Sequence, residues 1–171
     1  DVAPAPVLVL SNHFSWWDGF VMNYLNFSHL HKRFHVMMLE EELSKRMFLN
    51  KAGAYSIRKH ARSLLESLHY TAALMKNPDN MAVLYPQGEI QSLYHYPVRF
   101  ERGISRVLAQ VPAHTAVVFA VVLVDYFSYI RPQMRIYLEQ TTPAACQGHQ
   151  QAETLFNAFM QACIDKQVPE N

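Results

Sequence analysis

The chain has few cysteines, few charged residues and no long hydrophobic run. Its two cysteines, Cys146 and Cys163, are too few for a disulfide scaffold and lack the spacing of a zinc site, so we expect free thiols in a reducing compartment. Charged residues make up only 17% of the chain, and 15 basic against 14 acidic side chains leave a net charge of +1. This balance argues against a nucleic-acid-binding protein, which usually gathers a basic surplus on one face.

No segment of the sequence is apolar for long enough to span a bilayer. The longest charge-free apolar stretch, residues 111–124, contains Pro112 and His114 and falls short of the about 20 residues that a spanning helix needs. No basic segment precedes an apolar run at the start, so no signal peptide is predicted. Because the chain opens with Asp1 rather than methionine, an N-terminal membrane anchor upstream of it stays open.

Apolar residues make up 50% of the 171, which allows a full core and excludes intrinsic disorder. With no internal repeat, low-complexity tract or Gly/Ser linker, we predict a single domain over residues 1–171. Short, mainly apolar segments predict strands at 7–10, 34–39, 55–57, 81–85 and 116–124, and alternation of apolar with polar residues predicts a half-exposed strand at 133–139. Capping residues and 3.6-residue spacing predict helices at 16–27 (capped by Ser15), 40–53, 61–76, 103–111 and 150–167. This alternation predicts an α/β layered sandwich with a mixed, largely parallel sheet flanked by helices.

Residues 11–18, Ser-Asn-His-Phe-Ser-Trp-Trp-Asp, place His13 between the first predicted strand and helix, at a sheet edge where α/β sites gather. Asp18 lies one helical turn further on, from where its carboxylate can reach Nδ1 of the imidazole, fix the tautomer and raise the basicity of Nε2. Such a base can take a proton from a hydroxyl. His35 and Glu40 share this spacing, but they fall in a strand and in an acidic helix start. Chance gives such a His–Asp spacing in roughly a quarter of chains of this composition, so a capping loop with an incidental histidine stays open.

Two further stretches combine glycine with polar residues after predicted strands or turns. In residues 85–89, Tyr-Pro-Gln-Gly-Glu, the glycine lets backbone N–H groups approach a ligand, although a plain Pro-Gly turn fits as well. Residues 53–59, Gly-Ala-Tyr-Ser-Ile-Arg-Lys, form a turn followed by cations suited to an anion, for which an exposed basic loop is the simpler interpretation.

Histidines and aromatic residues allow functional and structural interpretations. No carboxylate or cysteine supports His29, His31 and His35 at metal-ligand spacing, so solvated or capping histidines are expected and no metal site is predicted. Aromatic residues crowd the first predicted helix. Part of them must be core, and for the rest two interpretations stay open, the lining of an apolar groove and contact with a bilayer: Phe14, Trp16, Trp17, Phe20, Tyr24 and Phe27.

Taken together and in order, these stretches resemble the lysophospholipid (glycerolipid) acyltransferase family, which includes bacterial 1-acyl-glycerol-3-phosphate acyltransferases. Residues 12–18 resemble its Asn-His-x-Ser-x-x-Asp catalytic block, and residues 53–58 its second block of a glycine, a hydrophobic residue and an arginine. Residues 85–88 fall where the family carries Phe-Pro-Glu-Gly-Thr-Arg, and residues 99–103 resemble the following Phe-Lys-x-Gly segment. The order and spacing of the blocks carry the resemblance, which covers roughly residues 7–125.

The resemblance implies acyl transfer in phospholipid biosynthesis, from acyl-CoA or acyl carrier protein to a hydroxyl of a glycerolipid-like or lyso-lipid acceptor. It assigns the role of general base to His13 and its orientation to Asp18, with no metal and no cofactor beyond the acyl donor as co-substrate. It implies substrate binding by Asn12, Ser15, Gly53, Arg58, Gln87, Gly88, Glu89 and Arg102. The expected location is the cytoplasmic face of a membrane, with apolar rather than electrostatic attachment because the net charge is small. No nucleic-acid partner is expected, and the oligomeric state stays open.

The chain departs from the family pattern at three places. Gln87 replaces a glutamate, and Glu89 and Ile90 stand where threonine and a phosphate-binding arginine are expected. The fourth block, residues 116–120, lacks its proline. We therefore expect an acceptor whose head group is not a simple phosphate monoester. Two alternatives stay open: a non-catalytic lipid-binding domain on the same scaffold, and an acyl-thioester hydrolase, since a base that activates a hydroxyl can activate water.

Overall fold

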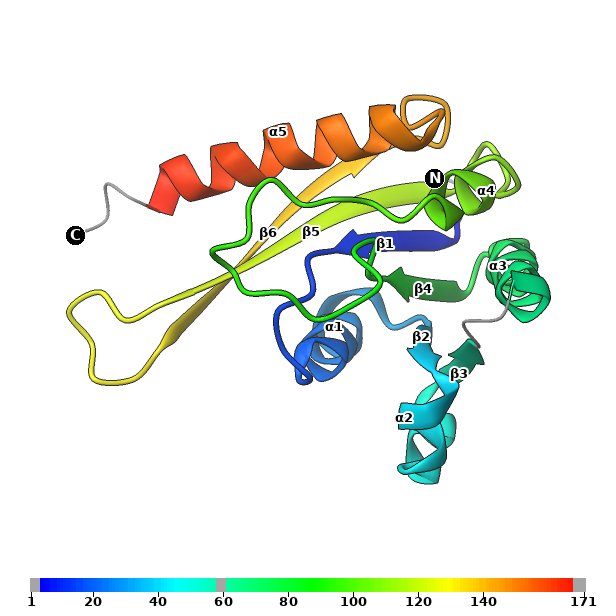
Figure 1. Ribbon diagram of the computed structural model, residues 1–171, viewed down its shortest axis with the longest axis horizontal. Helices are drawn as coiled ribbons and strands as arrows, with labels where there is room; N and C mark the ends of the chain where they lie inside the picture. Colours follow the sequence, from blue (N-terminus) through cyan, green and yellow to red (C-terminus); the bar gives the residue numbers. More distant parts are fainter. Residues whose placement is uncertain (1–3, 58–60, 168–171) are drawn as a thin grey trace.

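The computed structural model describes residues 4–57 and 61–167 (Figure 1). Six strands form one sheet in the order β3-β2-β4-β1-β5-β6. Their bounds are β1 Val7–Ser11, β2 Arg33–Leu39, β3 Ala54–Ile57, β4 Asn80–Leu84, β5 Ala116–Asp125 and β6 Gln133–Thr141. The helical segments are α1 Asp18–Leu25, η1 Asn26–Leu30, α2 Glu40–Ser44, η2 Met47–Ala52, α3 Ala61–Leu74, α4 Gly103–Leu108 and α5 His149–Gln167.

Five neighbouring strands of the sheet run parallel. β1 pairs with β4 and β5, and β2 pairs with β3 and β4, all in parallel, whereas β6 runs antiparallel to β5. The carboxyl ends of the five parallel strands therefore lie at one edge of the sheet, where α/β proteins place their sites. The predicted α/β sandwich with a mixed, largely parallel sheet is confirmed.

The central strands are buried on both faces. All five residues of β1 are buried, as expected of a parallel strand between two helical layers. Because side chains alternate along a strand, Leu8 and Leu10 join the core cluster of α3, α4 and α5, while Val7 and Val9 join the cluster that includes residues of α1, α2 and η2. Both cysteines are buried free thiols in or beside the first cluster.

Two predicted helices are shorter or more broken than their sequence patterns suggest. The helix predicted at 16–27 begins only at Asp18 and gives way after Leu25 to the π-helical turn η1. Ser15 is not its cap; the Ser15 hydroxyl instead accepts a hydrogen bond from the Trp17 N–H at 3.2 Å. The segment predicted as one helix at 40–53 is split into α2 and the 3₁₀ helix η2, since apolar spacing alone does not distinguish one helix from two short ones.

Gly53 ends η2 in the left-handed conformation, with φ of 93°. A Cβ at this position would overlap the carbonyl oxygen of Phe34 on β2, so the close approach of the two segments requires glycine. The local backbone structure thus explains why glycine stands at position 53, where a substrate-binding residue is expected.

A long loop without helix or strand joins β4 to α4, the green trace in Figure 1. Helix α5 holds it: the Asn157 side-chain amide accepts the Val98 N–H and donates to the Val98 carbonyl, both at 2.8 Å. The Phe100 N–H donates to the Glu153 carboxylate at 2.7 Å, and Val98 and Phe100 are buried. The later part of the loop is therefore fixed to the body of the protein.

No helix in the described part of the chain is both long and apolar enough to cross a membrane.

Candidate active site

The site begins where β1 leaves the sheet. Asn12 follows the last strand residue, and its side-chain amide takes the place of a backbone group: Oδ1 accepts the Val122 N–H at 2.8 Å and Nδ2 donates to the Val122 carbonyl at 2.9 Å. The residue is 2% exposed. Asn12, expected among the substrate-binding residues, thus anchors the end of β1 to β5 and directs the next residue, His13, off the sheet.

One carboxylate oxygen of Asp18 binds the short loop that comes after Asn12. Its Oδ2 accepts hydrogen bonds from Nδ1 of His13 at 2.8 Å and from the N–H groups of Phe14 and Ser15 at 2.9 Å each. Side-chain exposure is 2% for Asp18 and 20% for His13. The carboxylate is fixed from three directions, and because it occupies Nδ1, it leaves Nε2 as the ring nitrogen for another partner.

Tyr85, directly after β4, packs on the imidazole. The two ring centroids are 4.1 Å apart and the planes differ by 18°, a stacked arrangement that restricts rotation of the His13 ring. The Tyr85 hydroxyl is buried without a hydrogen-bond partner among the described residues. Burial raises the pKa of Tyr85 well above its usual value, and the nearby Asp18 charge raises it further, so the hydroxyl keeps its proton.

The loop after β4 holds the backbone of His13. Because β1 and β4 are neighbours in the sheet, the loops after their carboxyl ends lie side by side. The His13 N–H donates to Oε1 of Gln87, and the His13 carbonyl accepts the N–H of Gln91 at 2.9 Å. The structure therefore brings Gln87, expected to bind substrate, together with His13 through the His13 backbone.

Gly88 and Glu89 lie in the same loop. Gly88 has φ of 72°, and a Cβ there would press on the Glu101 side chain at 3.0 Å, so glycine is required for the turn. Glu89 is exposed, and its carboxylate accepts a hydrogen bond from Nε2 of Gln91 at 3.2 Å. Ser15 contributes its N–H to Asp18, as described above. These residues shape the loops around His13.

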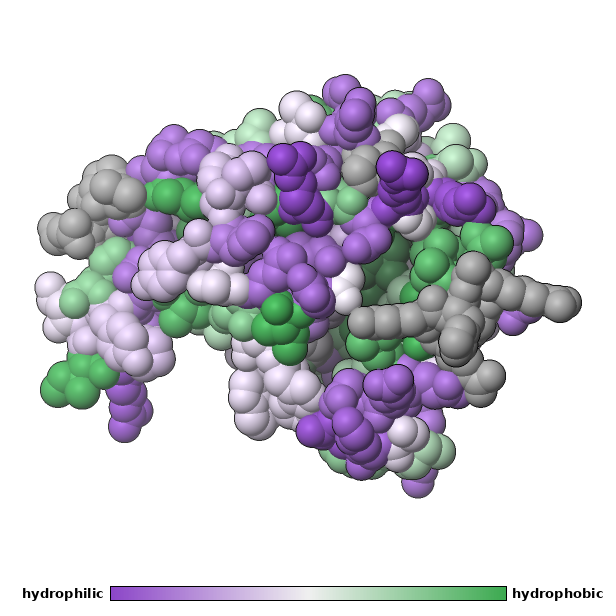
Figure 2. All heavy atoms as spheres, viewed as in Figure 1, coloured by the Kyte–Doolittle hydropathy of each residue, from purple (hydrophilic) through white to green (hydrophobic). Residues whose placement is uncertain are grey.

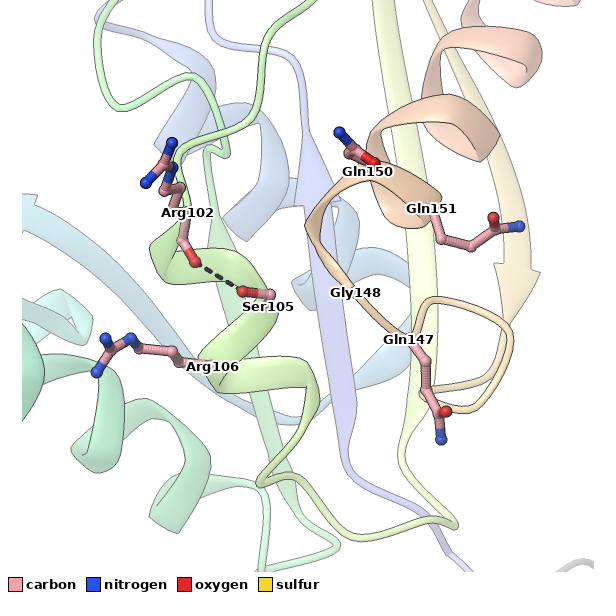
Figure 3. Close-up of a pocket in the computed structure, with 7 residues that line it drawn as sticks. All are labelled: Arg102, Ser105, Arg106, Gln147, Gly148, Gln150 and Gln151. Carbon is pink, nitrogen blue, oxygen red and sulfur yellow. Dashed lines mark hydrogen bonds between the residues drawn. The ribbon is translucent and has the colours of Figure 1, made fainter.

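Arg102 is the next residue after Glu101, whose N–H donates to the Pro86 carbonyl at 2.7 Å and whose side chain lies beside Gly88. Arg102 itself is exposed and lies just before α4. Arg102 lines a polar depression with Ser105, Arg106, Gln147, Gly148, Gln150 and Gln151 (Figure 3). Figure 3 shows the two arginine side chains pointing away from Gln147 and Gln151. Arg58, the other expected cation, lies outside the described residues.

Sequence reasoning missed two residues that touch His13. The sequence places Tyr85 at a strand end and at the start of the third block but gives its side chain no role, and the parallel pairing of β4 with β1 is what places its ring beside the histidine. Gln91, four residues after Gln87, carried no signal of its own in one sequence. In the part of the chain that the structure describes, no group of three or more His, Cys, Asp or Glu side chains could hold a metal ion.

The fold and the site define a class of protein: an α/β sandwich with a His–Asp pair at the carboxyl edge of its parallel strands, suited to general-base chemistry. The family model described as "Acyltransferase" matches residues 1–124, most of the chain. The chain belongs to this family, that of 1-acylglycerol-3-phosphate acyltransferase-like enzymes, which confirms the resemblance of its sequence blocks. Acyl transfer is the activity that this membership supports. No curated protein sequence matches the chain.

Proposed function

We propose that the chain moves a fatty acyl group from acyl-CoA or acyl carrier protein to a hydroxyl of a glycerolipid-like or lyso-lipid acceptor, with His13 as general base. The observation that carries the proposal is the 2.8 Å contact between Nδ1 of His13 and the buried Asp18 carboxylate. A histidine oriented in this way, partly exposed at a sheet edge, is suited to activating a hydroxyl that the substrate itself supplies.

The proposed reaction needs only these two side chains and the two substrates. As the acceptor oxygen attacks the thioester carbonyl, its proton passes to Nε2 of His13, and Asp18 stabilises the imidazolium through Nδ1–H. The tetrahedral intermediate then collapses, the C–S bond breaks, and the leaving thiolate takes the proton back from Nε2. The products are an ester and a free thiol, and His13 returns to its neutral form. We assign no role to a metal or cofactor.

The proposed acceptor carries a head group other than a simple phosphate monoester. Ile90, where the family pattern has an arginine, is 50% exposed and offers a phosphate no charge. The exposed carboxylate of Glu89 beside it would repel a dianion. Residues 85–90, which stand where the family has its third block, thus carry no cation.

We further propose peripheral attachment to the cytoplasmic face of a membrane. Large apolar side chains are exposed in three places: at and just before α1 and η1, on η2, and at the tip of the β5–β6 hairpin, which projects from the body in Figure 1. They are Trp17, Tyr24, Phe27, Met47, Phe48, Tyr126, Tyr129 and Ile130. Figure 2 shows this projecting tip at the lower left of the view. Aromatic and aliphatic side chains of this kind bind the interface of a bilayer without needing a large net charge.

Release of free thiol with and without acceptor tests the proposal. The substrates are acyl-CoA and acyl carrier protein loaded with the same chain, each with a panel of lyso-lipids. The expected result is thiol release that depends on the lyso-lipid and matches the ester formed. Equal release without acceptor would instead identify a thioester hydrolase. No release with any pair, together with lipid binding, would identify a non-catalytic lipid-binding domain.

A further inference from the structure

Three hydrogen bonds close a ring through His13, Gln87 and Gln91, here called the glutamine ring. The His13 N–H donates to Oε1 of Gln87, Nε2 of Gln87 donates to Oε1 of Gln91 at 3.0 Å, and the Gln91 N–H donates to the His13 carbonyl at 2.9 Å. Both backbone polar groups of His13 are thus held by the loop after β4. Gln87 is 6% exposed, and both polar atoms of its amide are engaged.

The direction of each amide in the glutamine ring follows from its neighbour. Oε1 of Gln87 must face the His13 N–H, so its Nε2 must face Gln91, which then has to present Oε1. This orientation turns Nε2 of Gln91 outward, where it donates to the Glu89 carboxylate. A carboxylate at position 87 could accept from the His13 N–H but could donate nothing to Gln91. The arrangement therefore needs a side chain at position 87 that accepts at one atom and donates at the other, as the glutamine amide does.

We propose that Gln87 is a positioning residue: its amide, oriented through Gln91 and Glu89, holds the backbone of His13 so that the imidazole meets the acyl acceptor in reacting geometry. This proposal rests on the function proposed above, in which His13 is the general base. It replaces the expectation that Gln87 binds substrate, because a buried amide with both atoms engaged has to leave the glutamine ring before it can contact a ligand.

Gln87→Ala is the first test. Misplacement of a reacting group by about 1 Å can cost 10²-fold in rate, so we expect kcat to fall about 10- to 100-fold while KM for the acceptor stays within about twofold. Amide hydrogen exchange in residues 12–15 and 88–91 is expected to accelerate, a readout that needs no substrate. The matched control is Gln140→Ala, on an exposed position of β6 away from the site. A raised KM with unchanged kcat would overturn the proposal in favour of substrate binding.

Gln87→Glu tests the need for a donor. A carboxylate there meets Oε1 of Gln91, and if the Gln91 amide turns over, its Oε1 meets the Glu89 carboxylate instead. In either arrangement a carboxylate faces the Gln91 amide oxygen, and this repulsive contact replaces a hydrogen bond. We therefore expect Gln87→Glu to lower kcat about tenfold in the otherwise unchanged chain. In the Glu89→Gln background the amide at position 89 can donate to the turned Gln91, and the loss caused by Gln87→Glu should largely disappear. An equal loss in both backgrounds would overturn the proposed orientation.

His13→Ala separates failure of this inference from failure of the proposed function. Retained turnover in His13→Ala would refute the general base, whatever the Gln87 variants do. The positioning role alone would be refuted by two results together. These are an inactive His13→Ala protein and a Gln87→Ala protein whose kcat and amide hydrogen exchange in residues 12–15 equal those of the wild type.

Discussion

Asp18→Asn separates the charge of the orienting carboxylate from its geometry. All three hydrogen bonds to the Asp18 side chain end on a single oxygen, Oδ2. The asparagine carbonyl oxygen can occupy that place and accept the same three donors, so the loop and the His13 ring keep their positions. What the variant loses is the negative charge opposite the imidazolium that forms when His13 takes the acceptor's proton.

The magnitude follows from the difference between charged and neutral acceptors. A hydrogen bond to a charged group contributes about 1.5–3 kcal/mol and a neutral one about 0.5–1.5 kcal/mol, so the transition state loses about 1–2 kcal/mol, or roughly 5- to 30-fold in kcat. Removing the base itself in His13→Ala should cost about 10²- to 10⁴-fold. We therefore expect kcat to fall in the order wild type, Asp18→Asn, His13→Ala, at saturating donor and acceptor.

Thermal unfolding provides the control for these rates. Asp18→Asn should unfold near the natural temperature, whereas Asp18→Ala leaves three donors without their acceptor at a buried position and should lose about 2–5 kcal/mol of folding free energy. Turnover at the natural rate in a well-folded His13→Ala protein would refute the general-base assignment. A collapse of stability in Asp18→Asn as large as that in Asp18→Ala would refute the separation of charge from geometry.

Four further outcomes are expected. The value of kcat/KM should be about 10- to 100-fold higher for an uncharged or zwitterionic lyso-lipid than for lysophosphatidate with the same donor, and the reverse preference would contradict the acceptor proposal. Co-sedimentation with liposomes should change little between low and high salt and fall in Ile130→Glu; release by salt would indicate an electrostatic surface instead. Tyr85→Phe keeps the stacked ring and removes an unpartnered buried hydroxyl, so chemical denaturation should show unchanged stability or a gain of about 1 kcal/mol, and a clear loss would reveal a partner. Gly53→Ala should lose at least about 1–3 kcal/mol, because its φ is positive and an added Cβ would overlap the Phe34 carbonyl oxygen, whereas the control Gly19→Ala, helical and with open space around it, should lose nothing.

Much of the fold follows from patterns that are local in sequence. All six predicted strands are present within one or two residues of their expected ends, because short apolar runs mark buried strands such as β1 and alternation marks the half-exposed strand β6. The contact between His13 and Asp18 was predictable for the same reason, since a loop of four residues entering a helix keeps the two side chains within reach. The split of residues 40–53 and the π-helical turn at Asn26–Leu30 were not, because they depend on how the segments pack against β2 and α1.

Contacts between segments far apart in the sequence could not be predicted from it, because they depend on the order of the strands in the sheet. The bond between Asn12 and Val122 joins residues that are 110 positions apart, and its existence depends on β5 being the neighbour of β1. The stacking of Tyr85 on His13 likewise depends on β4 being the other neighbour. The substrate-binding role expected of Arg102 stays a prediction, since the residue is exposed before α4 and lines a polar depression there.

These distant contacts change what the sequence blocks mean for catalysis. Asn12 binds the backbone of β5, Gly88 supplies a backbone turn that a side chain would strain, and Gln87 holds the N–H of His13. Each of these residues contacts or shapes the backbone near the histidine. A base that follows the end of a strand has no regular hydrogen-bond partners of its own, so its position must come from the neighbouring strand ends. Within the described site, the imidazole of His13 is therefore the group we expect to meet the acceptor hydroxyl, and the acceptor's identity has to come from the exposed surface of the loop at Glu89 and Ile90.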